Sequence, residues 1–73
     1  MRLEIYDGDD VVRMIGAVVI RTSPSGDICL DFGPADGPPL VSFTMNVDQG
    51  RDLSQALKGV VDGRDETVLI VEG

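Results

Sequence analysis

The sequence predicts an α+β domain: a four-stranded antiparallel meander, one helix packed on one face of the sheet, and a C-terminal fifth strand, in the order β-β-β-β-α-β. The first observation behind this prediction is a switch of period between Val41 and Val61. Residues 41–45 alternate apolar and polar, as a half-buried strand does, and the apolar residues from Leu53 onward recur at helical spacing. The second observation is that the other apolar runs end at turns rich in Asp, Gly, Pro and Ser. With 73 residues, the chain is predicted to be one domain, residues 1–73.

The first half of the chain is predicted to hold three strands. Residues 2–6 alternate apolar and polar and form the first strand. The segment 7–10 is a turn, because Asp and Gly accept the backbone angles that turns require. Residues 11–22 form a long second strand, and the Ser, Pro and Gly residues of 23–27 form a second turn. Residues 28–32 alternate again and form the third strand.

A proline-rich loop separates the third strand from the fourth. The three prolines of residues 33–39 cannot donate hydrogen bonds to a sheet, so this segment is predicted to be a loop. Residues 40–45 then form the fourth strand.

The helix is predicted to cover residues 47–61. Asn46 is a favourable N-cap residue, and Gln49 three residues later completes a capping-box pattern. Gly63 is the predicted residue just beyond the C-terminal end of the helix. After a short turn, residues 67–72 are predicted to form the last strand.

Short connections place consecutive strands side by side, which predicts the strand order 4-3-2-1-5. An alternative order places the last strand parallel to the fourth, through a right-handed crossover. In either order the helix is expected to bury Leu53, Leu57 and Val60 against one face of the sheet.

The second strand is apolar on both of its faces, whereas a strand with one face in water alternates cleanly. One helix covers only one face of a sheet, so the other face is expected to meet a partner. A homodimer is the first choice and another protein the second; the alternative is a small apolar patch on a monomer. The residues of this expected oligomer face are Ile15, Ala17, Val19, Leu69 and Val71.

The chain is acidic, with thirteen acids, six bases and a formal net charge of -7. In an up-and-down meander alternate connections share an end of the sheet, so three acidic connections are expected to lie together. This acidic end is a candidate docking surface for a basic partner or a weak cation site. The alternative interpretation is that Asp simply favours turns and helix ends. Its residues are Asp7, Asp9, Asp10, Asp36, Asp62, Asp65 and Glu66.

The sequence offers no catalytic, cofactor-binding or metal-binding motif. It contains no histidine, which excludes Ser-His and Cys-His pairs within one chain. Cys29 lies between apolar neighbours in a predicted strand, which indicates a buried or half-buried thiol. The Asp-rich segment from Asp7 lacks the glycine and glutamate positions of an EF-hand loop. We therefore predict no catalytic residues, no cofactor and no metal, and a chain that is not an enzyme.

Charge and hydropathy argue against other classes of partner. The five arginines are scattered and Lys58 is the only lysine, whereas binding to a phosphate backbone needs clustered bases. No apolar run approaches the about 20 residues of a membrane span, and the N-terminus lacks the apolar stretch of a signal peptide. The sequence thus predicts a cytoplasmic protein with no direct nucleic-acid, membrane or small-molecule partner.

Residues 44–57 resemble a strand-to-helix segment of small uncharacterised actinobacterial and actinophage proteins. In that segment a cap residue, a proline and Glu-Gln-Ala-Arg-Glu-Leu lead into an alanine-rich helix. This chain departs from it at Val47, where the segment has proline, and at Gly50, where it has alanine. The resemblance implies an actinobacterial or phage source and a similar local fold, and it carries over no functional residues.

Small size, acidity, the lack of catalytic groups and a second apolar face predict a protein-interaction module, such as a phage or mobile-element factor that binds a host protein. One alternative is a structural subunit of a larger assembly, for example a virion component. Another is an acidic mimic of nucleic acid, which requires acids spaced along an elongated surface.

Overall fold

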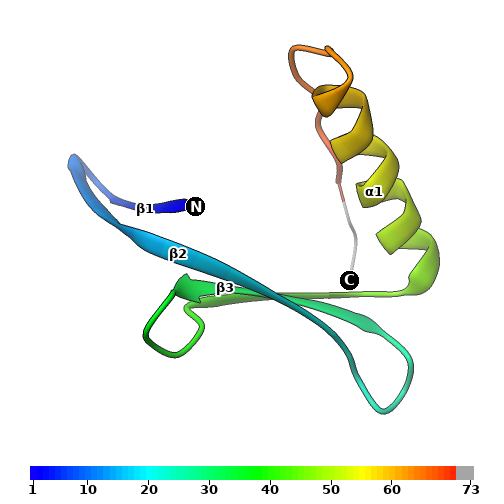
Figure 1. The fold of residues 1–73 in the computed structure, drawn as a ribbon, viewed down its shortest axis with the longest axis horizontal. Coiled ribbons are helices and arrows are strands. Elements are labelled where there is room, and N and C mark those ends of the chain that lie inside the picture. Colours follow the sequence, from blue (N-terminus) through cyan, green and yellow to red (C-terminus); the bar gives the residue numbers. More distant parts are fainter. Residues whose placement is uncertain (71–73) are drawn as a thin grey trace.

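The computed structural model describes residues 1–70, and it contains a four-stranded antiparallel sheet and one helix (Figure 1). The predicted α+β class and the predicted meander are confirmed, because the strands follow one another across the sheet in the order β1-β2-β3-β4. The elements are β1 (Arg2–Asp7), β2 (Asp10–Thr22), β3 (Ile28–Pro34), β4 (Val41–Met45) and α1 (Val47–Val61).

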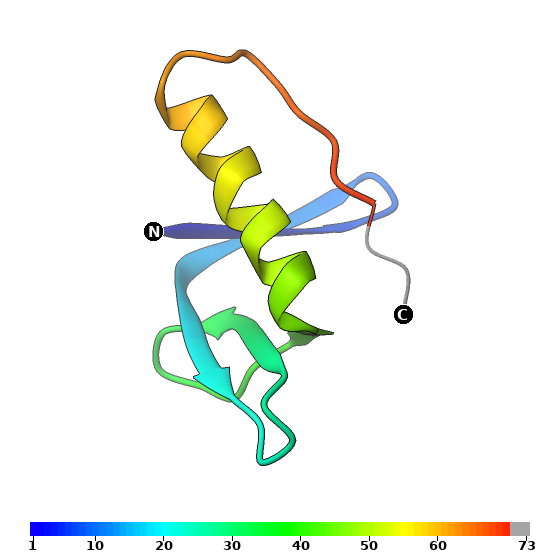
Figure 2. The ribbon, with the colours of Figure 1, turned by 90° about the vertical axis from the view of Figure 1, so that its right-hand side faces the viewer.

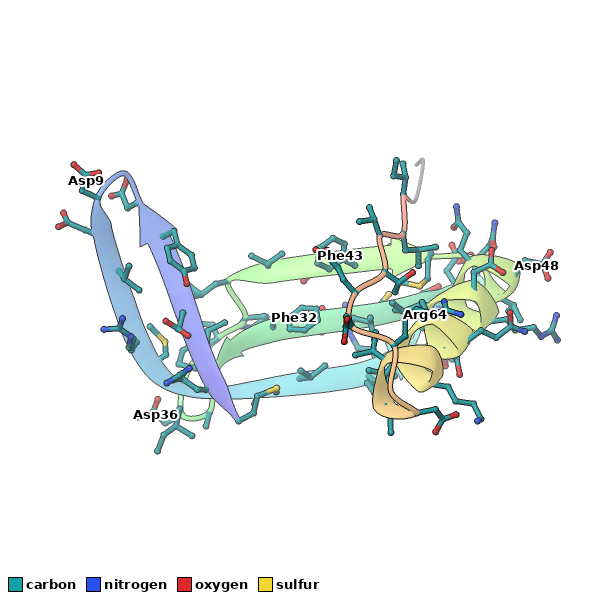
Figure 3. All side chains as sticks on the ribbon, turned by 90° about the horizontal axis from the view of Figure 1, so that it is seen from above. Asp9, Phe32, Asp36, Phe43, Asp48 and Arg64 are labelled. Carbon is teal, nitrogen blue, oxygen red and sulfur yellow. The ribbon has the colours of Figure 1, made fainter. Side chains whose placement is uncertain are left out.

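Strand β2 changes partner halfway along its length. Its first half pairs with β1, from Asp10 to Ile15, and its second half pairs with β3 from Gly16 onward. At the point where β2 changes partner, the amide of Gly16 donates to the carbonyl of Met1 over 2.9 Å. The β1–β2 hairpin therefore forms an arm that leaves the plane of β3 and β4 (Figure 3).

Gly16 stands where β1 and β2 come closest. A methyl group on Gly16 would lie 2.7 Å from Cβ of Leu3. Because Cβ is attached directly to the backbone, it cannot move aside by rotation of the side chain. We expect Gly16→Ala to lower the free energy of unfolding by about 1–3 kcal/mol, the usual cost of overpacking. Urea denaturation measures this cost.

Gly59→Ala is the control for this substitution. The new methyl group would lie at ordinary contact distance, 3.4 Å, from the guanidinium of Arg64. Alanine also favours a helix over glycine by up to about 1 kcal/mol, so stability should stay level or rise. If Gly16→Ala also raised the stability, the close packing of the arm at Gly16 would be contradicted.

The predicted helix boundaries are confirmed at both ends. The side chain of Asn46 accepts from the amide of Gln49 over 2.8 Å, and the Gln49 side chain accepts from the amide of Asn46 over 3.0 Å. At the other end Gly63 has a φ of 119°. The amides of Gly63 and Arg64 donate to the carbonyls of Val60 and Gly59, which is a Schellman-type end.

The predicted fifth strand is not formed in the part of the chain that the structure describes. After α1 the chain turns back toward the sheet, but residues 67–70 pair with no strand (Figure 2). Val68 and Ile70 are 78% and 82% exposed. The last predicted strand residues, 71 and 72, lie outside the described residues.

The prediction that α1 buries its apolar stripe is wrong for this chain on its own. None of its residues is buried, and Leu57 is 63% exposed. The reason is geometric, since α1 starts against the sheet and then rises away from it (Figure 1). Among the described residues, the buried apolar side chains are only those of Cys29 and Met45.

Candidate interaction surface

The strand register sorts the side chains of β2, β3 and β4 onto two very different faces. Directly paired residues project to the same side of a sheet. One row of partners is Val18, Phe32 and Val41, and the next is Ile20, Leu30 and Phe43. These six apolar residues form what we call the open face, and no charged residue interrupts it.

Two aromatic rings lie at the centre of the open face. Phe32 and Phe43 pack edge to face, with ring centroids 5.8 Å apart and planes at 90° (Figure 3). Phe43 is nevertheless 54% exposed, and Ile20, at the other end of the same row across Leu30, is 72% exposed. A contiguous group of large exposed apolar side chains typically marks a binding surface.

The β1–β2 arm rises at one end of the open face. The arm lies on the same side of the sheet as α1, in two views at right angles (Figures 1 and 2). An open groove of about 530 Å³ separates the arm from the strands below. Its lining is mainly apolar and consists of Leu3, Glu4, Ile5, Tyr6, Phe32, Leu40 and Val41.

Helix α1 rises at the other end of the open face. Its first turn approaches the sheet closely at Gly50, where a methyl group would lie 2.5 Å from Cδ1 of Ile28 and 4.0 Å from Sδ of Met45. The glycine thus permits contact at the start of the helix. Farther along the apolar stripe, Leu53 is half-buried, whereas Leu57 and Val60 are exposed, Val60 by 40%.

Polar side chains interact on the opposite face of the same three strands. Nε of Arg21 donates to Asp31 over 2.8 Å, and the hydroxyl of Ser42 donates to the other carboxylate oxygen over 2.7 Å. The hydrogen bond from Arg21, and to a smaller extent the one from Ser42, holds the pKa of Asp31 below its ordinary value. Cys29 is buried on this face, 3.7 Å from the hydroxyl of Thr44, as the sequence predicted.

The lowered pKa of Asp31 makes stability depend on pH. The carboxylate is favoured in the folded chain, so its contribution is present above the unfolded-chain pKa of about 3.9. It is lost as the pH falls through the lower pKa of the folded chain. We expect wild-type stability to fall below about pH 4, and Asp31→Asn to flatten that part of the curve, as urea denaturation at several pH values would measure.

Asp9→Asn is the control, since Asp9 lies in the exposed turn of the arm (Figure 3). Asp9→Asn should leave the loss of stability at low pH the same as in the wild type. Parallel pH curves for wild type and Asp31→Asn would contradict the coupling between Asp31, Arg21 and Ser42.

The structure places the predicted oligomer face in two parts. Ile15, Ala17 and Val19 alternate along β2 on the same side as Asp31, opposite the open face. Ile15 and Val19 are exposed by 75% and 54%. Leu69 lies in the C-terminal segment, away from any strand pairing, and Val71 lies outside the described residues.

The seven acids of the expected acidic end are not brought together. Asp7, Asp9 and Asp10 belong to the tip of the arm, and Asp36 belongs to the β3–β4 loop. Asp62, Asp65 and Glu66 follow α1, whose end lies far from both in the two perpendicular views (Figures 1 and 2). The bend of the arm and the rise of α1 separate the three connections.

Within residues 1–70, no group of three or more His, Cys, Asp or Glu side chains is arranged to hold a metal ion. No helix of this part of the chain is long and apolar enough to cross a bilayer. Comparisons with protein-family models, with curated proteins and with solved structures find no match to the chain.

Sequence reasoning missed the open face, because it assigned that face to the helix. The signal was present in the register: in β2, β3 and β4 every residue on that side from Val18 to Phe43 is apolar. The two glycines of the helix, Gly50 and Gly59, were a second indication that the helix would not cover this face, because glycine has no side chain to bury.

Proposed function

We propose that this chain is a small acidic protein-interaction module, without enzymatic activity, that binds protein through the open face. The observation that carries the proposal is the exposure of large apolar side chains on one continuous surface. Ile20, Val41 and Phe43 are exposed by 72%, 51% and 54%. Covering such side chains is favourable by about 25 cal/mol per Å² of apolar surface.

A photo-crosslinking amino acid tests this proposal in cells that make the chain. p-Benzoylphenylalanine in place of Phe43 keeps an aromatic ring on the open face, and the same residue in place of Ile15 serves as control on the opposite face. We expect a discrete protein adduct from position 43 and none from position 15. Equal adducts from both positions, or none from either, would contradict the proposal.

A structural subunit of a larger assembly is the alternative, and one observation favours it. The opposite face also exposes apolar side chains, at Ile15 and Val19. An assembly that continues beyond two copies would use both faces. In that case position 15 would crosslink as well, and the purified chain would sediment as a species much larger than a dimer.

The predicted fifth strand belongs to the same proposal. Residues 67–70 are mainly apolar but pair with no strand among the described residues. We propose that this segment becomes a strand only when a bound protein covers the open face. The acids lie in separate turns, an arrangement that gives no support to a nucleic-acid mimic.

A further inference from the structure

We infer that the protein covering the open face is a second copy of this chain, in a two-fold symmetric dimer. This inference rests on the proposed function and names its partner. Three observations support it: the large accessible surface of the chain, the distribution of charge, and the positions of the β1–β2 arm and α1 beside the open face.

The accessible surface of the chain is too large for a folded monomer. It measures 5872 Å², whereas a folded monomer of this mass exposes about 4,400 Å². The radius of gyration is 13.9 Å, against about 11 Å for a compact domain of this length. Ile20 on the open face, Leu57 on α1 and Val68 in the C-terminal segment, exposed by 72%, 63% and 78%, contribute to this large surface.

The size of the excess fits an obligate dimer. It amounts to about 1,500 Å² per chain, or about 3,000 Å² for two chains, within the range of about 2,000–5,000 Å² that obligate homodimers bury. Among residues 1–70 no large side chain is fully buried within one chain, and oligomerisation is one of the ways in which a domain this small is stabilised. A second copy is the one partner that is present whenever the chain is.

The distribution of charge also favours a second copy. A net charge of -7 would oppose self-association if the acids lined the contact. They do not, because the open face carries no charge, and the charged residues of α1 lie about 100° or more around the helix axis from Leu53. Those residues are Asp48, Arg51, Asp52 and Lys58. A basic partner would find no acids on this surface to pair with.

The arm and α1 determine how two copies fit. Both project from the same side of the sheet, so two open faces cannot meet flat (Figure 1). Of the two, α1 carries the exposed apolar residues Leu57 and Val60, and it approaches its own sheet closely at Gly50. The stripe of each copy therefore packs on the open face of the other, which gives two identical contacts as two-fold symmetry requires.

Two isoleucines of β2 provide a matched test by sedimentation velocity. Ile20 on the open face and Ile15 on the opposite face are exposed by 72% and 75%. From about 1 to about 100 μM, the full chain should sediment at twice its 7.8 kDa mass. Ile15→Asp should keep that species and Ile20→Asp should lose it. A folded 7.8 kDa wild-type species throughout, or a dimer lost only with Ile15→Asp, would overturn the inference.

The wild-type chain gives a second readout if Ile20→Asp does not fold. Unfolding of a dimer to two chains is concentration-dependent, so the urea midpoint should rise with chain concentration. A constant midpoint would overturn the inference. The crosslink from position 43 separates the two proposals: an adduct of twice the chain mass supports the dimer, and an adduct of another mass overturns the dimer while the interaction module stands.

Discussion

Phe43→Ala is expected to lower the free energy of unfolding by about 3–5 kcal/mol, the cost of removing a fully buried phenylalanine. Within one chain Phe43 is 54% exposed, and a surface substitution usually changes stability by no more than about 0.5 kcal/mol. We expect this large cost because, in the proposed dimer, the stripe of a second copy covers the ring, and because the edge-to-face contact with Phe32 is lost. Urea denaturation at concentrations where wild type is dimeric measures the difference.

A pair of valines provides the control for this prediction. Val41 on the open face and Val19 on the opposite face are exposed by 51% and 54%. Val41 lies in β4, which pairs only with β3, and Val19 lies in the half of β2 that also pairs only with β3, so each position has one neighbouring strand. If the open face is covered, Val41→Ala costs more than Val19→Ala. The reverse order would contradict the coverage of the open face.

Gly33→Ala is expected to cost more than about 3 kcal/mol, because the new methyl group would meet backbone and not side chains. It would lie 2.7 Å from Cα of Pro39 and 2.8 Å from the carbonyl oxygen of Pro38. That loop is fixed, since the amide of Leu40 donates to the carbonyl of Phe32 over 2.7 Å. Thermal unfolding followed by circular dichroism should show a largely unfolded chain.

Gly37→Ala in the same loop is the control. Its methyl group would meet only the ring of Pro34, at 3.0 Å from Cγ, and the ring pucker can adjust. We expect a much smaller loss of stability than for Gly33→Ala. Equal losses of stability for the two variants would show that the close contact at Gly33 is not the cause of the effect of Gly33→Ala.

Local chemistry made the helix and the turns predictable from the sequence. Asn46, Gln49 and Gly63 fix the ends of α1 through their own side chains and backbone angles, and the structure has the helix at the predicted residues 47–61. The strand runs were predictable for the same reason, because alternation and turn residues are read within a few positions. The meander followed from the short connections.

The open face was not predictable, because it depends on how elements are placed in three dimensions. The sequence predicts that Leu53, Leu57 and Val60 lie on one side of α1, but not that the helix rises away from the sheet after Gly50. The bend at Gly16, where β2 changes partner, is likewise tertiary. It moves the acidic turn of the arm away from the end of α1, which separates the acids that were expected to lie together.

The most direct test of the central claim is an isotope-filtered NOE spectrum of a mixture of labelled and unlabelled chains. It detects only contacts between protons of different copies. We predict cross-peaks between the ring protons of Phe43 in one copy and the methyl protons of Leu57 in the other. A well-folded chain that shows these contacts only within one copy, or none between copies, would contradict the claim that a second chain covers the open face.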